Sequence, residues 1–216
     1  MSPEALAALP ASHRLIVAAG ALRSGSTAVY NIARLILEQQ DGSFTAGWFK
    51  DIKGPVGDSV LVKIHRWEPA LAERADVVLT SHRDLREIVR SMAAIGWLKP
   101  EPDVYPQLER IVGFQTQWQS VATLDVAYEA MKRDMLAAVS AIAAAIGGDS
   151  SQVDFGVIVR EVDAMPSPSA LPEGQPHDLK TLMHLNHRSR ETTAPLLIED
   201  AIHRHFLAWQ TMHGYF

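Results

Sequence analysis

Residues 20–27 place two glycines, three hydroxyl side chains and one cation in a short stretch, Gly20-Ala-Leu-Arg-Ser-Gly-Ser-Thr27. Backbone N–H groups in such a turn, together with the first turn of a following helix, bind anions. The stretch therefore predicts an oxyanion site, and a Ser/Thr cap of the helix is the alternative. The residues that would form the site are Arg23, Ser24, Gly25, Ser26 and Thr27.

A lysine and a histidine stand two residues apart in Lys63-Ile64-His65. The apolar run from Val60 to Ile64 predicts a strand, in which residues two apart point the same way. Lys63 and His65 would then project together at the C-terminal edge of a sheet, where α/β proteins bind ligands. A cation beside an imidazole suits group transfer, because one stabilises a leaving oxygen and the other accepts a proton. A solvated strand end is the alternative.

Two further apolar runs also end in residues that could bind a ligand. Arg83 follows the run from Val77 to Ser81, and Ser91 lies eight residues later in a predicted helix. Together they can hold a phosphate, although a solvated helix start would look the same. Tyr128 ends the run that begins at Asp125, where it would contact a nucleotide base or be a buried aromatic residue.

The elements that must position these residues alternate along the chain. An apolar run from Leu15 to Ala19 precedes the glycine-containing turn, and a helical pattern follows it. Further helices are predicted after Arg83, from Met131 to Ile146 and from Pro195 to His213. Such alternation predicts one α/β domain over residues 1–216, a parallel sheet flanked by helices with a P-loop-like first turn. The Pro-rich residues 165–177 are predicted to be a loop or lid.

The four sets of residues occur in a fixed order, each at the C-terminal end of a strand, and this layout resembles the sulfotransferases that use 3′-phosphoadenosine 5′-phosphosulfate (PAPS). Arg23-Ser-Gly-Ser-Thr27 is similar to their 5′-phosphosulfate loop, and Lys63-x-His65 to their K-x-H pair. Arg83 with Ser91 matches their 3′-phosphate motif. The segment from Tyr128 to Asp134 resembles their Y-E-D-[ML]-K-x-D segment.

The C-terminal part of the chain resembles bacterial members of this family more weakly. The similar segments are Leu185-Asn-His-Arg-Ser189 and the tail from Trp209 to Tyr215. Two features depart from the family: Ala28 stands where a tryptophan often follows the loop, and no R-K-G triplet is present. The resemblance implies that Arg188 and Ser189, or Arg190, replace that triplet at the 3′-phosphate.

The resemblance implies transfer of a sulfuryl group from PAPS to a hydroxyl, or an amine, of a small-molecule acceptor. His65 would be the general base, and Lys63 and Arg23 would stabilise charge in the transfer. No metal is implied, because arginine and lysine supply the positive charge. The acceptor stays open; candidate pocket residues are Trp48, Phe49, Trp67, Trp97 and Phe114.

Two other functions remain possible on the sequence. A P-loop kinase is disfavoured because Ser26 replaces the lysine of G-x-x-x-x-G-K-[ST] and because the third strand ends in His82-Arg83 rather than a metal-binding Asp. A non-catalytic nucleotide-binding relative is disfavoured by the intact Lys63 and His65.

Composition narrows the remaining classes. The 216 residues carry a net charge of −5, which disfavours a nucleic-acid partner. The chain has no cysteine, which excludes disulfides and thiolate chemistry. It has no membrane-length apolar run and no basic leader, so we expect a cytoplasmic protein. The closest histidine pairs, His184-x-x-His187 and His203-x-His205, do not fit a zinc motif, and the oligomeric state is left open.

Overall fold

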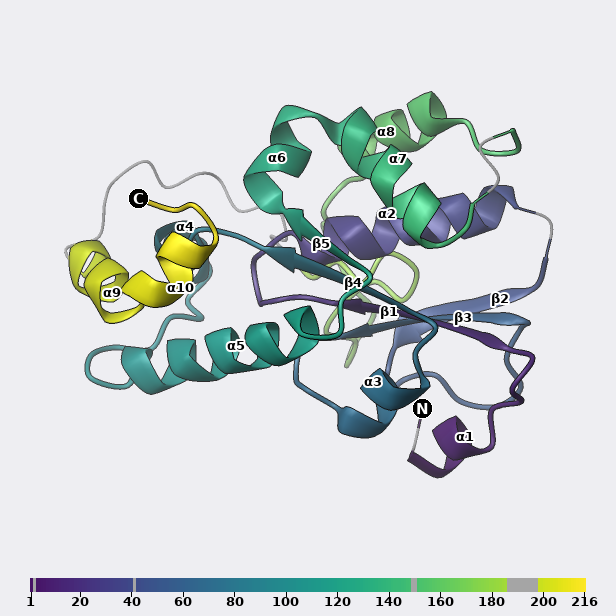
Figure 1. The fold of residues 1–216 in the computed structure, drawn as a ribbon, viewed down its shortest axis with the longest axis horizontal. Helices are drawn as coiled ribbons and strands as arrows, with labels where there is room; N and C mark the ends of the chain where they lie inside the picture. Colours follow the sequence, from purple (N-terminus) through teal and green to yellow (C-terminus); the bar gives the residue numbers. More distant parts are fainter. Residues whose placement is uncertain (2, 41, 149–150, 186–197) are drawn as a thin grey trace.

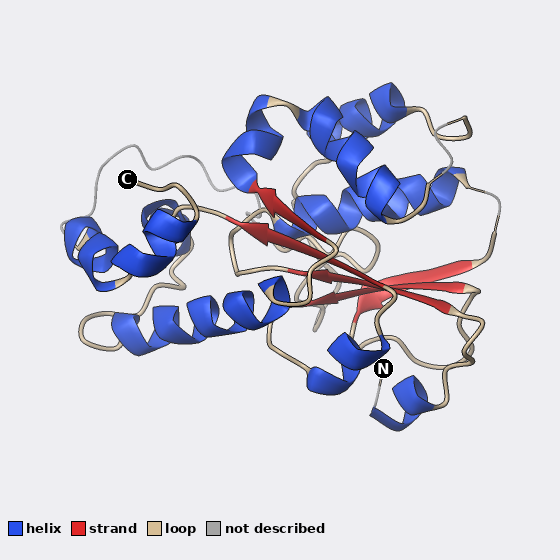
Figure 2. Ribbon diagram, in the orientation of Figure 1, coloured by secondary structure: helices blue, strands red, loops and turns tan. Residues whose placement is uncertain are grey.

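Five parallel strands form one sheet in the computed structural model, which describes residues 1, 3–40, 42–148, 151–185 and 198–216. The strands lie in the order β2-β3-β1-β4-β5, with their C-terminal ends at one edge (Figure 2). The observed topology agrees with the predicted α/β class. The strands are β1 (Arg14–Ala19), β2 (Phe44–Trp48), β3 (Ser59–Ile64), β4 (Val77–His82) and β5 (Leu124–Ala127).

Helices cover both faces of the sheet and extend beyond its C-terminal edge (Figure 1). One face carries α2 (Ser26–Gln39), α7 (Met135–Ala145) and α8 (Phe155–Ala164), and the other carries α1 (Pro3–Ala7), α3 (Pro69–Arg74) and one end of α5 (Val104–Gln119). Beyond the ends of β4 and β5 lie α4, α9 and α10. The remaining bounds are α4 (Leu85–Ala93), α6 (Tyr128–Arg133), α9 (Glu199–His205) and α10 (Leu207–Met212).

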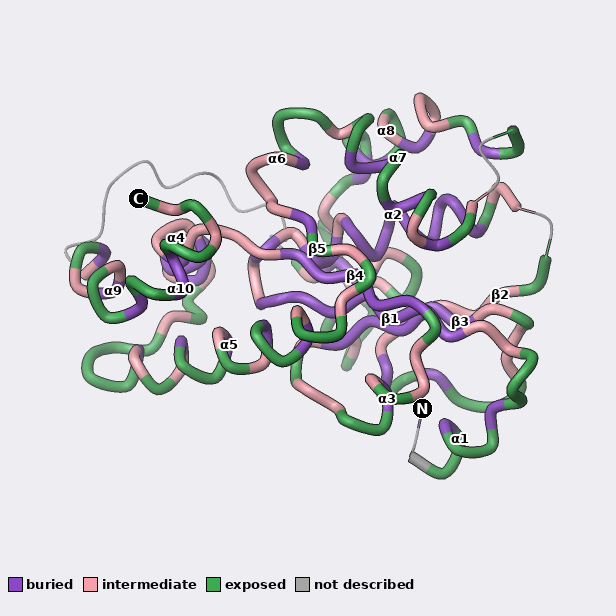
Figure 3. The backbone as a smooth tube through the Cα atoms, in the orientation of Figure 1, coloured by how far each residue is buried: buried purple, intermediate pink, exposed green. Residues whose placement is uncertain are grey.

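The central strands are buried on both faces, as parallel strands between helical layers must be (Figure 3). Their side chains alternate between two apolar clusters. Ile16 and Leu61 pack with the α2 side, whereas Leu15 and Val62 pack with the α1 and α3 side. This double burial holds the strand ends, and the loops that follow them, in fixed positions.

Two long helices predicted from the sequence are each interrupted. The pattern from Met131 to Ile146 is divided between α6 and α7 at Asp134, whose backbone is not helical (φ −141°) and whose side chain caps α7 by accepting from Ala137 N–H. Within the described residues, the predicted C-terminal helix consists of α9 and α10, which meet at Phe206 (φ −107°). The start of that prediction, residues 195–197, lies outside the described residues.

Residues 165–177 contain neither helix nor strand, as predicted. The two ends of the segment, Met165 and His177, are buried, whereas most residues between them are exposed or half-buried. Among the described residues, no helix has both the length and the apolar character needed to span a membrane.

Candidate functional site

Two residues of the turn between β1 and α2 have a left-handed backbone conformation. Arg23 has φ 64° and Gly25 has φ 87°, values that favour glycine, and Gly25 lies at the helix N-cap. A Cβ atom on Gly25 would stand 2.5 Å from the Tyr128 ring, so only glycine fits there. The Ser24 hydroxyl is fully buried, donating to the Ala21 carbonyl at 2.7 Å and lying 2.9 Å from the Ser81 hydroxyl. Ser24 therefore fixes the turn from inside.

A cleft of 790 Å³ opens beside this turn, and most of the predicted site residues line it. Lys63 and Ser24 lie beneath the cleft wall, fully buried, and Arg188 and Ser189 lie outside the described residues. The fold thus brings together residues from four strand ends. The predicted residues that line the cleft are Arg23, Gly25, Ser26, Thr27, His65, Arg83, Ser91 and Tyr128.

Lys63 supports the turn from the sheet. Its ammonium group donates to the Ser26 hydroxyl at 3.1 Å and lies 5.5 Å from the centre of the Trp48 ring. Burial holds the pKa of Lys63 well below its usual 10.5. Trp48 pairs with Lys63 across β2 and β3. The buried amino group of Lys63 therefore lies directly behind the N-terminus of α2, where an anion would bind.

His65 faces the same turn two residues further along β3. Its Nδ1 lies 2.7 Å from the Gly20 carbonyl, so Nδ1 carries the proton and Nε2 keeps its lone pair. Burial, with a smaller effect of the Lys63 charge, lowers the pKa of His65 to about 3. The ring stands edge-on to Trp48, with 5.1 Å between ring centres. His65 is therefore a neutral imidazole in the free protein, with the Nε2 lone pair available.

Two arginines meet on the other side of the cleft. Arg23 donates through Nε to the Ser91 hydroxyl at 2.8 Å. The Arg83 guanidinium lies 4.3 Å from the centre of the Tyr128 ring, and its Nε is buried with no hydrogen-bond partner among the described residues. Burial and the nearby Arg83 charge lower the pKa of Arg23. Two guanidinium groups therefore lie close together on this side of the cleft, an arrangement that suits an anion.

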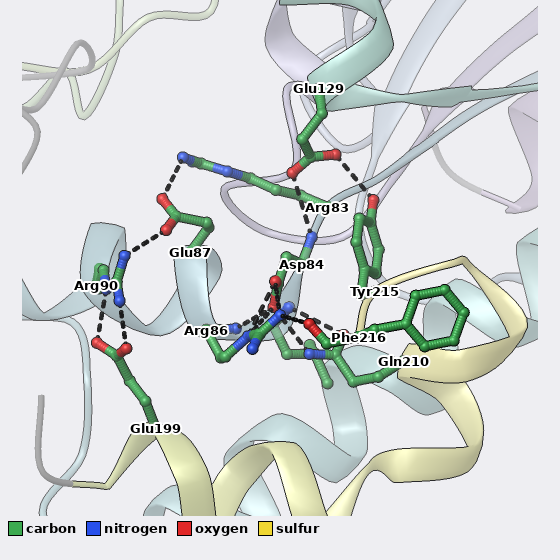
Figure 4. Close-up of polar contacts among 11 residues, drawn as sticks. Arg83, Asp84, Arg86, Glu87, Arg90, Glu129, Glu199, Gln210, Tyr215 and Phe216 are labelled. Atoms are coloured by element: carbon green, nitrogen blue, oxygen red, sulfur yellow. Dashed lines mark hydrogen bonds and ion pairs between the residues drawn. The ribbon is translucent and has the colours of Figure 1, made fainter. Parts of the chain in front are cut away.

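Carboxylates on neighbouring helices hold Arg83 and Arg90 in a chain of ion pairs (Figure 4). Glu87 bridges them, at 3.2 Å from Arg83 and 2.6 Å from Arg90. Arg90 also makes two contacts, 2.6 and 2.5 Å, with Glu199 at the start of α9. The chain thus connects the cleft to the C-terminal helices.

Several cleft residues have no counterpart in the sequence prediction. His184 lies 3.2 Å from the Arg23 guanidinium and 4.8 Å, centre to centre, from the Trp97 ring. Of the aromatic candidates for an acceptor pocket, Trp48 and Trp97 line the cleft, whereas Phe49 is buried in the core. The only sequence signal for His184 was its spacing to His187, which does not fit a zinc motif. Other unpredicted lining residues include Glu87, Arg90, Met131, Lys132, Met135 and Met183.

Comparison with known proteins identifies the fold. The chain matches the crystal structure of mouse sulfotransferase SULT7A1 complexed with PAP, with a TM-score of 0.62, 14% sequence identity, and coverage of 96% of this chain and 88% of that chain. It also matches retinol dehydratase in a complex with retinol and PAP, with a TM-score of 0.47, 13% identity, and coverage of 71% and 64%. No protein-family model and no curated protein sequence matches it. The chain therefore has a sulfotransferase fold, which confirms the predicted fold class.

Proposed function

We propose that this protein is a PAPS-dependent sulfotransferase acting on a hydroxyl, or an amine, of a small molecule. The observation that carries the proposal is the position of Arg23, Arg83 and Ser91 in one cleft with the loop at the start of α2. These groups suit a ligand with two separate anionic groups. The mouse sulfotransferase with the same fold was crystallised with PAP, which supports a donor of this class.

In the proposed reaction, the loop and Arg83 hold the two ends of the donor. Backbone amides of Ser24 to Thr27 bind the 5′-phosphosulfate, and Arg83 with Ser91 binds the 3′-phosphate. Tyr128, which lies against Arg83, contacts the base. Positioning and electrostatics then carry most of the rate enhancement, as in phosphoryl transfer.

The acceptor oxygen attacks the sulfur as the bond from sulfur to the bridging phosphate oxygen breaks. The acceptor proton passes to Nε2 of His65, whose tautomer is held by the Gly20 carbonyl. Lys63 and Arg23 stabilise the negative charge that develops on the leaving phosphate. PAP and the sulfated acceptor are the products, and no step needs a metal.

Nucleotide binding tests the donor assignment first. By calorimetry, 3′,5′-adenosine bisphosphate should bind more than tenfold tighter than 5′-AMP, because one charge-assisted contact contributes about 1.5–3 kcal/mol. Arg83→Ala should remove most of this preference, whereas the exposed Arg133→Ala should preserve it. Equal affinities for the two nucleotides in the unmodified protein would exclude the assignment.

Turnover is tested with isotopically labelled PAPS and a panel of alcohols, phenols and amines, followed by mass spectrometry for an added sulfuryl group. Binding without turnover on a broad panel favours the non-catalytic relative. Magnesium-dependent consumption of ATP would favour the kinase instead.

A further inference from the structure

Three side chains that commonly bind metals meet where the paired strands β4 and β5 face the C-terminal tail. They are His82, the last residue of β4, Asp125 of β5, and His213, which follows α10. One ligand atom of each lies within 4.8 Å of the others. The Nδ1 atom of His82 is 2.8 Å from Oδ2 of Asp125, and the two imidazole centres are 4.5 Å apart. None of the three lines the cleft described above.

Hydrogen bonds orient His213 and Asp125 as they would for a metal, whereas His82 donates from Nδ1 to Oδ2 of Asp125 and would exchange that proton for the ion. His213 Nδ1 lies 2.8 Å from the Trp209 carbonyl, so Nδ1 carries the proton and Nε2 has a free lone pair. The Thr80 hydroxyl donates to Oδ1 of Asp125 at 2.6 Å and leaves Oδ2 toward the histidines. Metal-binding histidines and carboxylates usually have such outer partners, which set the tautomer and the orientation.

The side-chain amide of Gln119, the last residue of α5, lies where the lone pairs of His213 and Asp125 converge. Its nitrogen lies 2.8 Å from Nε2 of His213 and 2.7 Å from Oδ2 of Asp125. Both atoms are acceptors, so the amide group donates one hydrogen to each. A positively polarised group therefore already occupies the point that the lone pairs share. The hydrogen bond to Asp125 is solvent-exposed, so the amide has room to move aside.

We propose that His82, Asp125 and His213 bind a divalent transition-metal ion, with Zn²⁺ the best match and water completing the coordination. Two imidazoles and one carboxylate suit zinc, whereas calcium and magnesium prefer oxygen ligands alone. Tetrahedral ligands at zinc distances lie roughly 3.4 Å apart, so the three ligand atoms need only a small closure. Such an ion would fasten the C-terminal segment to the sheet, next to Arg83.

This site is independent of the transfer reaction, because its residues lie outside the cleft. It also differs from the closely spaced histidine pairs that the sequence analysis found not to fit a zinc motif, since its members come from three distant segments. The test is metal binding to the full chain, prepared without a polyhistidine tag and stripped with EDTA. Titration with Co²⁺ should give one tight equivalent with the absorption bands of a low-symmetry site, and Zn²⁺ should displace it.

His213→Gln should weaken Co²⁺ and Zn²⁺ binding at least tenfold, since even loss of an outer partner commonly costs that much. His205→Gln is the matched control, because His205 is also a C-terminal histidine paired with a carboxylate, 3.1 Å from Glu109. Zn²⁺ should raise the Tm of the wild type and of the control, but not of His213→Gln.

Circular dichroism in EDTA checks that His213→Gln is folded, and His82→Gln replaces it if it is not. Failure of the wild type to bind Zn²⁺ or Co²⁺ overturns the proposal. Equal affinities in His213→Gln and His205→Gln overturn it as well, since the ion would then bind elsewhere.

Discussion

Lys63 and His65 fix opposite ends of the anion-binding turn from one strand. Lys63 reaches Ser26 at the start of α2, and His65 reaches the carbonyl of Gly20 at the end of β1. Lys63 is fully buried and His65 is half-buried, and desolvation lowers the pKa of both, so their charged forms are disfavoured before any anion binds. A bound phosphosulfate would supply the missing negative charge. Donor binding should therefore raise the pKa of Lys63, the nearer of the two groups to the start of α2.

Substitution of His65, the proposed general base, should lower turnover without changing the affinity for PAP. His65→Ala should lower turnover at least about a hundredfold, at the lower end of the usual effect of a general base. The affinity for PAP should change little, because Nε2 addresses the acceptor. Turnover and calorimetry measure the two effects, with the surface variant His205→Ala as the control. A near wild-type rate in His65→Ala would place the base elsewhere.

The lowered pKa of His65 makes a separate prediction about pH. A base with a folded-state pKa of about 3 stays neutral as pH falls from 8 to 5, whereas an ordinary histidine would be mostly protonated by pH 5. NMR of the free protein should show an unchanged His65 imidazole over this range, with His65→Gln used to assign the signal. The unfolded state takes up the proton first, so this group's contribution to stability is fully present above pH 6.5 and is lost as pH falls from 6.5 to about 3. A midpoint near 6.5 in the native protein would contradict the prediction.

Replacing the buried lysine should stabilise the free protein and impair donor binding. Lys63 has no ion-pair partner among the described residues, so Lys63→Met removes a desolvated amine. We expect an increase of at least ~1 kcal/mol in the free energy of unfolding, or ~2–4 °C in Tm. PAP affinity should fall more than about tenfold. Thermal melts and calorimetry measure both quantities, and a lower Tm with intact affinity would show that Lys63 is merely structural.

At the scale of elements, the sequence predicted those strands that contain a run of apolar residues, together with the site residues at their ends. β1, β3 and β4 are almost wholly buried, so each contains at least three consecutive apolar residues, and the polar residues that follow stand out. The strand β2 was missed because most of its residues are only half-buried and its sequence, Phe-Thr-Ala-Gly-Trp, mixes residue types. Its last residue, Trp48, is nonetheless a cleft wall.

Contacts between distant elements could not be predicted from local spacing. Arg90 and Glu199 are 109 residues apart, and each alone looks like an ordinary charged residue on a helix surface. The pairing of Tyr215 with Glu129, at 2.9 Å, is of the same kind. These contacts depend on how α9, α10 and the tail pack beyond the sheet edge, which the hydrophobic pattern of each element does not determine.

The ion-pair chain between α4 and α9 predicts competition at the proposed 3′-phosphate site. Glu87 lines the cleft and lies 3.2 Å from Arg83, so it would repel or be displaced by a phosphate there. Glu87→Gln should tighten PAP binding about threefold to tenfold, with the modest energy of a partly exposed ion pair. Affinity for 5′-AMP, which has no 3′-phosphate, should stay constant and is the internal control. Weaker PAP binding in Glu87→Gln would show instead that Glu87 positions the arginine.

At the scale of the whole molecule, the charge around the cleft is opposite in sign to the net charge of the chain. The chain carries a net charge of −5, yet the charged residues that line the cleft are mostly cations. Arginines and one lysine there outnumber the two carboxylates, Glu87 and Asp163. An anionic donor would thus be attracted to one region of an otherwise acidic protein, and its association should slow as salt is added.

Residues 165–177 begin at the cleft and continue along the protein surface. We predict that this segment acts as a lid. Met165 lines the cleft at one end of the segment. Beyond the other end, the Thr181 carbonyl accepts from the Asn31 side chain at 2.8 Å, which ties the chain to α2. Between these anchors the residues are mostly exposed and rich in proline, so little packing opposes local opening.

Limited proteolysis tests the lid directly. A protease that cleaves after glutamate should cut first at Glu173, an exposed residue in the middle of the segment. Saturating PAP should slow this cut several-fold if the segment closes over the bound nucleotide, and mass spectrometry identifies the site. Glu173→Gln should abolish the early cut without changing PAP affinity, which separates protection of the lid from inhibition of the protease. A first cut elsewhere, or a rate at Glu173 that PAP leaves unchanged, would show that the segment is an ordinary surface loop.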